Sequence, residues 1–447
     1  MKRKKLSIAL GLILMFLPHI FAMETVWQML GIFIGSIWMW ITCPIELGSI
    51  ACLAALCLLP GVTPANVFSA SFGSATIMFL IFSFILTFAL SETGVLRRVA
   101  VFFIDNRISK KNVRMFIGMY FLSILAVGSF MAPTTVFILY FSIVQEIYGL
   151  LELEKGDKLA RNMMVGTGFF ASISCAMTPI AHTFPLMAMG YYETATGLTI
   201  SYVSYLKYGI PICLVLSICA CFLLIAGVKN EYDLSQISFE RKAMTDKEKL
   251  SVFVFLAVVA CWLITGIWPD KLSGLNALGT SWPAMIGCVV LAVCGCLDIK
   301  KGFEKGVSWS AILLCAATLA LGSFLTKDEF GVMPAVKAYM EPMLQKADIL
   351  LLIAVFAVVM TNLMSNIVTT TVSFNLFVPV LIATGLYSPE LATIAIGIGA
   401  SLAYALPSSI AHIALAGSSG WAESKDMLKY GCIMIAFSIL MIFMVMG

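Results

Sequence analysis

Uncharged apolar runs long enough to cross a lipid bilayer recur along the whole of this 447-residue sequence. The hydrocarbon core of a bilayer is about 30 Å thick, and about 20 residues of helix cross it. Water-soluble globular proteins have about 25% charged residues, whereas this chain has 12% charged and 61% hydrophobic residues. The sequence therefore predicts an all-α polytopic protein integral to the lipid bilayer, and it excludes a water-soluble globule.

About eleven runs are expected to span the membrane, and two further runs, which need not cross it, are considered separately below. The expected spans are residues 6–22, 24–42, 45–60, 74–91, 162–190, 202–228, 250–268, 282–298, 308–325, 391–420 and 428–446. The first run follows the basic start MKRKK, so residues 1–22 could also be a cleaved signal peptide, in which basic and apolar regions have this order. A start-anchor helix fits equally well, because many spans follow.

The placement of Lys and Arg predicts the orientation. With a cytoplasmic N-terminus, five of the 28 basic residues would lie outside, namely Lys207, Lys271, Lys327, Lys337 and Lys346, and the other 23 would lie inside. Cytoplasmic loops carry such an excess of basic residues. We therefore expect a cytoplasmic N-terminus and an external C-terminus, in a bacterial cytoplasmic membrane.

The two runs set apart, residues 115–145 and 349–389, carry no charge. As a helix the first would reach only about 46 Å, which is too long for one crossing and too short for two. It is therefore expected to form a re-entrant hairpin. The second run is longer and could form either a hairpin or two full crossings. Both alternatives return to the face of entry, so the charge pattern does not separate them.

Three short segments recur in the same order in the two halves of the chain. FALSETGV at 88–95 resembles FLTKDEFGV at 324–332, APTTV at 132–136 resembles VTTTV at 368–372, and TPIAHTFP at 178–185 resembles PSSIAHIA at 407–414. In the expected topology the two copies cross the membrane in opposite directions, and inverted repeats are typical of secondary transporters. The predicted domains are N-terminal scaffold helices (1–73), a first repeat (74–228), a cytoplasmic linker (229–250), further scaffold helices (251–307) and a second repeat (308–447).

Each repeat would contain one hairpin and one helix broken near the middle of the membrane. The midpoints of the four uncharged runs fall at Phe130, at Met177, at Thr369 and between Leu406 and Pro407. Proline, hydroxyl or amide side chains lie beside each midpoint. Irregular backbone is tolerated at this depth only where it is buried or lines a wet cavity. The four breaks are therefore expected to form one central site.

The four central runs contain no Asp, Glu, Lys or Arg. An anion there would be held by hydroxyls, amides and the positive N-terminal ends of helices, and a cation by neutral oxygens, which suit sodium. Proton coupling would depend on His182 and His412, since the unperturbed pKa of histidine is about 6.5. Two histidines without acidic or thiolate partners make a poor zinc site, and the 13 cysteines form no CxxC motif.

Three stretches resemble the divalent anion/sodium symporter family. They are MFLIFSFILTFALSETGVLRRVA at 78–100, TNLMSNIVTTTV at 361–372 and LPSSIAHIALAGSSG at 406–420. The resemblance covers most of the chain from about residue 24 onward. It implies eleven membrane helices with two re-entrant hairpins, a homodimer, and symport of dicarboxylate, citrate or sulfate with sodium by an elevator-like motion of the hairpin-bearing domain.

The resemblance also assigns site residues. Ser365-Asn366 matches the family's Ser-Asn-Thr hairpin motif with Ile367 in place of Thr, whereas the first hairpin reads MAPTT at 131–135 and lacks both Ser and Asn. His182 and His412 stand where the family usually has Thr or Pro. The expected cation ligands are Thr361, Ser365 and Asn366, together with carbonyls near Ser408 and Ser409. The expected solute-binding residues are Thr134, Thr135, Thr178, Ser365, Asn366, Thr369, His182 and His412, of which the two histidines would tune the affinity.

We therefore expect a secondary active transporter, not an enzyme, that carries a small anion together with sodium. Proton coupling through His182 and His412 is the alternative. An integral-membrane enzyme or a subunit of a redox complex is the hypothesis from a different class. No cofactor, no transition metal and no nucleic-acid partner is expected.

Overall fold

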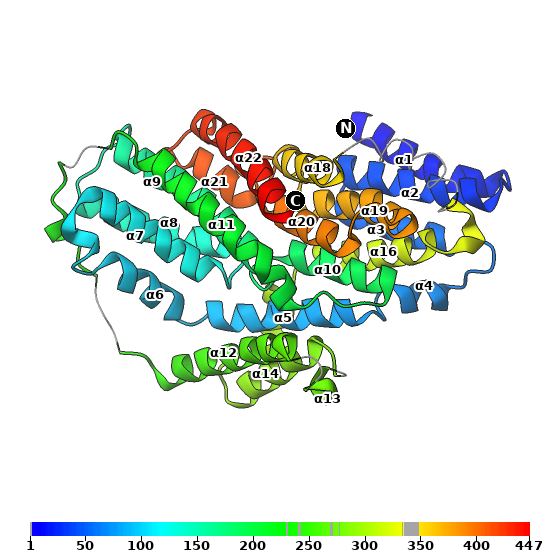
Figure 1. Ribbon diagram of the computed structural model, residues 1–447, viewed down its shortest axis with the longest axis horizontal. Helices are drawn as coiled ribbons and strands as arrows, with labels where there is room; N and C mark the ends of the chain where they lie inside the picture. The colour runs from blue at the N-terminus through cyan, green and yellow to red at the C-terminus, as the bar shows by residue number, and fades with distance from the viewer. Residues whose placement is uncertain are drawn as a thin grey trace.

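The computed structural model describes residues 2–228, 231–239, 243–268, 271–276, 278–332, 334 and 348–447. All regular elements in these residues are helices, as the apolar runs predict. Lys229, Arg241 and Lys242 of the expected linker, and the expected external Lys337 and Lys346, lie outside the described residues. In Figure 1 the helices α7 and α8 lie at one end of the long axis, and α1 to α4 lie toward the other.

The helices of the first half follow the expected spans and the expected hairpin. They are α1 (Lys2–Ile20), α2 (Thr25–Thr42), α3 (Ile45–Leu56), α4 (Pro64–Ala70), α5 (Ala75–Ser91), α6 (Val95–Ile104), α7 (Val113–Gly128), α8 (Pro133–Leu150), α9 (Lys158–Met177), α10 (Thr183–Thr196) and α11 (Tyr202–Ile225). A 3₁₀ turn, Ser109–Lys111, precedes α7.

The second half repeats this order after two additional long helices. The helices are α12 (Asp246–Ile267), α13 (Ser273–Asn276), α14 (Ser281–Val293), α15 (Ile299–Lys301), α16 (Trp309–Leu325), α18 (Ile349–Leu363), α19 (Asn366–Thr384), α20 (Pro389–Ser401), α21 (Ala411–Ser418) and α22 (Ser424–Met446). Short 3₁₀ or π turns are Leu234–Gln236, Gly302–Gly306 and Asp328–Phe330.

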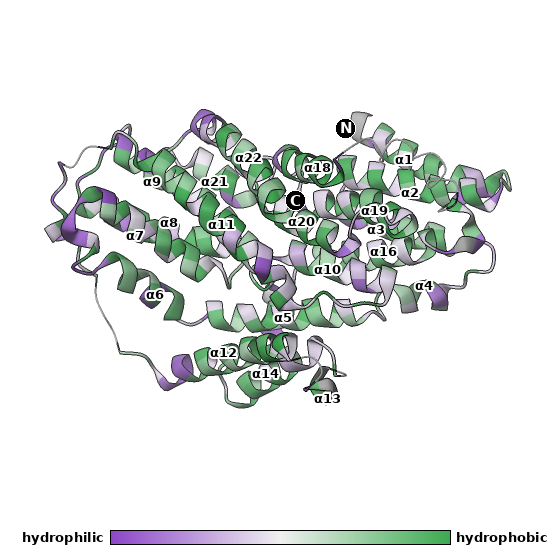
Figure 2. Cartoon of the chain, viewed as in Figure 1, coloured by the Kyte–Doolittle hydropathy of each residue, from purple (hydrophilic) through white to green (hydrophobic). Residues whose placement is uncertain are grey.

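Five helices in the described part of the chain are long and apolar enough to cross a membrane alone: α2, α11, α12, α19 and α22. Two bent pairs would raise this number to seven, α4 with α5 at 49° and Ile299–Gly306 with α16 at 71°. Large apolar side chains cover much of the outer surface, for example Val293 (82% exposed) and Phe222 (75% exposed). Figure 2 shows the hydrophilic colours mainly at helix ends and loops, as expected for a protein surrounded by lipid.

The two runs set apart each form a pair of helices. In the first, α7 ends at Gly128 and α8 begins at Pro133, which agrees with a break near Phe130. In the second, only Met364 and Ser365 separate α18 from α19. The expected midpoint at Thr369 is therefore wrong, because the Thr369–Thr371 run contains no helix breaker and continues α19.

Both expected broken helices are broken. Helix α9 ends at Met177 and α10 begins at Thr183, with Pro179 between them. Helix α20 ends at Ser401 and α21 begins at Ala411, with Pro407 between them. Proline lacks the backbone N–H that a continuing helix needs. The end expected at residue 190 is wrong, because α10 continues to Thr196.

The two halves interlock through these broken helices. Within the first half α7 and α8 pack against α9, and within the second half α18 and α19 pack against α20. Beyond the breaks the pairing crosses over, since α10 packs against α19 and α20, while α21 packs against α8 and α9. The four breaks are thereby brought into one central region.

Candidate functional site

Hydroxyl groups tie each unwound segment to the hairpin of its own half. The Thr178 hydroxyl donates to the carbonyl of Ser129, in the break between α7 and α8. The Ser408 hydroxyl donates to the carbonyl of Leu363, at the end of α18, with a longer separation of 3.5 Å. The two contacts occupy equivalent places in the two halves, and they hold each break of a broken helix beside a hairpin tip.

Asn362 makes four further hydrogen bonds, three of them to the second unwound segment, where Ser408 makes only one. Its Nδ2 donates to the carbonyls of Val358 (2.8 Å) and Leu402 (3.0 Å). Its Oδ1 accepts the N–H groups of Tyr404 (2.7 Å) and Ala405 (2.9 Å). Three of these bonds, to Leu402, Tyr404 and Ala405, pair backbone groups that the end of α20 would otherwise leave without a partner. Asn362 is therefore a structural residue of the site.

Each of the two histidines lies within hydrogen-bond distance of a serine from the other half of the chain. Ser172 of α9 donates to the carbonyl of Ala403 (2.6 Å) and lies 2.8 Å from His412 Nε2. Ser401 of α20 donates to the carbonyl of Gly397 (2.9 Å) and lies 3.1 Å from His182 Nδ1. Because each serine has used its one proton, each histidine nitrogen must be the donor. Each His–Ser pair thus joins one half to the other.

A row of buried polar groups on α19 has no hydrogen-bond partner in the part of the chain that the structure describes. Both amide atoms of Asn366 and the hydroxyls of Thr369 and Ser373 are buried and unpaired. Their spacing of three and then four residues places them on one face of the helix. More than 90% of buried polar groups in proteins are paired, so this row, beginning at the second hairpin tip, is the strongest mark of a ligand-binding surface.

The four helices that begin at the central breaks, α8, α10, α19 and α21, all lack a side-chain cap. Four helices begin at the outer ends of the same units. Three of them, α7, α18 and α20, are capped by Asn112, Asp348 and Ser388, and α9 has no side-chain cap. An uncapped helix N-terminus carries free N–H groups and a positive partial charge. The central region therefore presents four N-termini suited to an anion.

The remaining residues expected at the site lie at or near the breaks. Thr361 is buried and donates to the carbonyl of Ala400 (2.6 Å). Ser365 is the half-buried residue before α19, and Thr134 and Thr135 lie half-buried in the first turn of α8. Ser408 is exposed, and Ser409 is buried and donates within its own turn to Leu406 (2.6 Å).

Three features of the site were not expected from the sequence. Ser172 and Ser401 pair with the histidines, and their separation in the chain almost equals that of the two histidines, so extending the repeat would have found them. Asn362 has four bonding partners rather than free ligand atoms. The longer α10 also adds Glu193, a partly buried carboxylate in a pocket with Thr76, Tyr202 and Thr280.

A family model described as "Citrate transporter" matches residues 37–399. The chain is 26% identical over 343 residues to the putative malate transporter YflS of Bacillus subtilis, covering 72% of this chain and 69% of that protein. It is 22% identical over 447 residues to the sodium-dependent dicarboxylate transporter SdcS of Staphylococcus saprophyticus, covering 93% of this chain and 85% of that protein. These matches confirm the resemblance drawn from the sequence.

The fold also resembles a solved structure, that of the YdaH transporter of Alcanivorax borkumensis. The TM-score is 0.55 at 13% sequence identity, covering 86% of each chain. At this identity the similarity concerns the fold alone.

Proposed function

The chain belongs to the citrate transporter family, and we propose that it is a secondary active transporter that carries a small anion, of the dicarboxylate, citrate or sulfate class, together with sodium. The observation that carries the proposal is the set of four uncapped helix N-termini at the central breaks. Free N–H groups at a helix N-terminus hold an anion without a buried counter-charge.

The proposed solute site lies where these N-termini meet the hydroxyl side chains. Thr134 and Thr135 would contact the solute from the first turn of α8, and Thr369 from α19. Thr178 contributes less directly, since its proton is already given to the carbonyl of Ser129. A solute with two carboxylates can accept hydrogen bonds from groups of both halves at once, because α10 and α19 pack together and α8 packs against α21.

The proposed sodium site lies at the second hairpin tip. Asn366 supplies an unpaired and buried carbonyl oxygen. Ser365, beside it, and Thr361, on the preceding helix, supply further neutral oxygens. These oxygens suit a hard cation. Backbone carbonyls near Ser408 and Ser409 would complete the site, as expected from the sequence, and the hydroxyls of these two serines donate to the carbonyls of Leu363 and Leu406.

Several coarser features of the proposal rest on the family resemblance. We propose eleven membrane helices and two re-entrant hairpins in an inverted repeat, a homodimer, and an elevator-like motion of the hairpins and broken helices against the remaining helices. The equal order of elements in the two halves and the crossed packing of α10 and α21 support a repeat. The proposed location is a bacterial cytoplasmic membrane.

Uptake into liposomes tests the proposal. Succinate, malate, citrate and sulfate would be offered with sodium or potassium outside, at about pH 6 and about pH 8. We expect sodium-dependent uptake of an anion that is lost in Asn366→Ala and retained in Ser142→Ala, a matched change on the exposed face of α8. No uptake of any anion in either salt would contradict transport, and uptake that ignores sodium would contradict the coupling ion.

The histidine pairs favour a second candidate, in which protons rather than sodium drive transport. His412 has an unpaired Nδ1 in addition to its bond with Ser172, so it has one nitrogen free to take a proton. This mechanism predicts uptake that follows a pH gradient, ignores sodium and disappears in His412→Gln. Equal uptake by His412→Gln and the parent protein would exclude it.

A further inference from the structure

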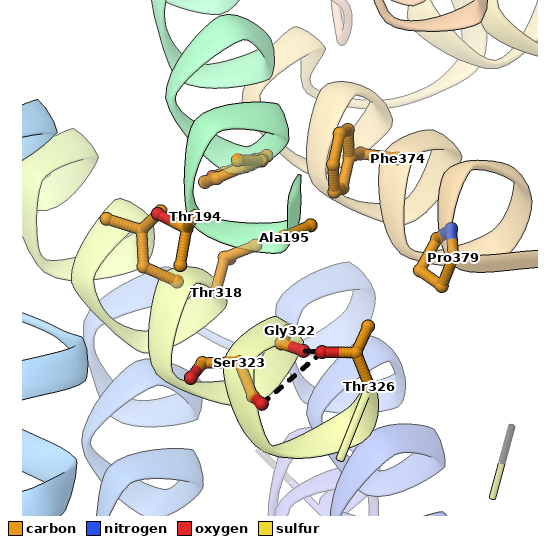
Figure 3. Close-up of a pocket in the computed structure, with 10 residues that line it drawn as sticks. Thr194, Ala195, Thr318, Gly322, Ser323, Thr326, Phe374 and Pro379 are labelled. Carbon is orange, nitrogen blue, oxygen red and sulfur yellow. Dashed lines mark hydrogen bonds between the residues drawn. The ribbon is translucent and has the colours of Figure 1, made fainter. Parts of the chain in front are cut away.

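A small pocket lies between α10, α16 and α19, away from the central breaks. Figure 3 shows Thr318, Gly322 and Ser323 of α16 opposite Thr194 and Ala195 of α10 and Phe374 and Pro379 of α19. Tyr191 of α10 also lines it. The pocket has room for about one water molecule or one small ion, so it cannot hold the organic solute of the transporter.

Polar side chains meet around this pocket from all three helices. The Tyr191 hydroxyl lies 3.2 Å from the Thr371 hydroxyl of α19. Thr371 and Asn375 are one turn apart on α19, and Thr318 and Gly322 are one turn apart on α16, so each pair shares a helix face. An added Cβ at Gly322 would lie 3.7 Å from Asn375 Oδ1, so the α19 pair faces the α16 pair.

Asn375 supplies the observation that indicates a ligand. It is only 3% exposed, and its Nδ2 donates to the carbonyl of Thr371 (3.0 Å), but its Oδ1 accepts no hydrogen bond. Exchanging the two amide atoms would only leave the nitrogen unpaired instead. A buried amide oxygen without a partner costs about 1–3 kcal/mol, so a bound group that uses this oxygen would be stabilised.

We propose that a monovalent cation, sodium or potassium, binds at the edge of this pocket, where α10, α16 and α19 meet. Its ligands would be the hydroxyl oxygens of Tyr191 and Thr318, which line the pocket. Asn375 Oδ1, which lies beside Gly322, and the Thr371 hydroxyl, which lies beside Tyr191, would complete the site. All four ligands are neutral oxygens, which hard cations accept. No carboxylate among the described residues lines the pocket, whereas calcium and magnesium are usually held by carboxylates. The nearest acid along α10, Glu193, lines a different pocket.

The pocket is distinct from the hairpin site. Asn366, Thr369 and Ser373 lie on one face of α19, and Thr371 and Asn375 lie roughly on the opposite face at 100° per residue. Nine residues also separate Asn366 from Asn375, which is about 13 Å along the helix. One ion therefore cannot contact both asparagines.

The position of the pocket suggests a role that rests on the proposed elevator motion. Helices α10 and α19 belong to the assembly that would move, and α16 belongs to the part that would stay. A cation held between them would stabilise the conformation in which α16 faces Asn375. Ion binding at this pocket would then select one state of the transport cycle, in addition to any ion bound at the hairpin.

The test is cation-dependent stability of the purified protein, because a ligand that binds the folded state raises the melting temperature. Sodium, potassium and choline chloride would be titrated at constant ionic strength without any anion solute. We expect two saturable components of stabilisation by alkali cations, of which Asn375→Leu removes one and Asn366→Ala removes the other. Ser142→Ala, which alters an exposed hydroxyl of α8 away from both sites, should retain both.

A second variant keeps the test valid if Asn375→Leu does not fold. Asn375→Asp has the same shape and adds a negative charge, so it should lower the apparent dissociation constant of one component by about tenfold or more. Unchanged titrations in both Asn375 variants, or equal effects of choline and sodium, would overturn the proposal. The readout needs no transport, so a failure to carry any anion would contradict the proposed function and leave this result standing.

Discussion

Two asparagines four residues apart show how differently one residue type is used in this site. Asn362 has all of its amide atoms paired with backbone groups of Val358, Leu402, Tyr404 and Ala405. Asn366 is equally buried, and neither of its amide atoms has a partner. The first stabilises the fold of the site, and the second is available for a ligand.

This contrast predicts opposite effects of alanine at the two positions. Asn362→Ala should lower the melting temperature with and without sodium, because each buried backbone group left unpaired costs about 1–3 kcal/mol. Asn366→Ala should change the melting temperature little without sodium and should reduce the stabilisation that sodium gives. Melting curves of the purified variants in sodium and in choline measure both effects. Equal loss of stability in the two variants without sodium would show that Asn366 is structural.

The helices meet at the two hairpin tips in different ways. In the second hairpin, Asn362 of α18 holds the backbone that follows α20. In the first hairpin α7 ends at Gly128, and an added Cβ there would lie 2.0 Å from Ser174 Oγ of α9. The first hairpin is therefore held by close contact between α7 and α9, whereas the second is held by the hydrogen bonds of the Asn362 amide. The tip of the first hairpin also lacks the Ser and Asn of the second.

The close contact predicts a clash and its rescue. Gly128→Ala should lower the melting temperature and reduce uptake, because the Ser174 side chain cannot move far within a buried helix contact. Adding Ser174→Gly removes both atoms nearest to the new Cβ and should restore most of the loss. A double-mutant cycle on melting temperature measures the coupling. No coupling between the two positions would mean that α7 and α9 are not in contact there.

The whole molecule is organised by the crossing of its two halves. Helix α10 of the first half packs against α19 and α20, and α21 of the second half packs against α8 and α9. The His412–Ser172 and His182–Ser401 pairs lie on the same crossing. Neither half by itself would contain a complete site.

The excess of basic residues expected inside predicts the orientation of the termini. A reporter enzyme that is active only outside the cytoplasmic membrane should be active when fused after Gly447 and inactive when fused within the expected linker 229–250. A reporter active only in the cytoplasm should show the reverse pattern. The same reporter activity at both positions would contradict the predicted number of crossings between the linker and the C-terminus.

The sequence by itself determined the helical class, the position of most helices and the two prolines at which helices break. Run length, charge and proline are local properties of the sequence. The thickness of the bilayer relates run length to a membrane span, and the missing N–H of proline accounts for a helix break. It also indicated the family, because Ser365-Asn366 and the repeated Ile-Ala-His lie in short continuous motifs.

Only the tertiary structure decided which polar groups pair. Serine and threonine in a helix can donate to a carbonyl of their own helix, as Ser401 does to Gly397, so their presence in the sequence does not reveal a partner. The packing of α9 against α21 brings His412 within hydrogen-bond distance of Ser172. The packing of α18 against α20 lets the Asn362 amide bond to the backbone that follows α20. The same packing leaves Asn366 and Asn375 with unpaired oxygens, because no helix among the described residues brings a donor to them.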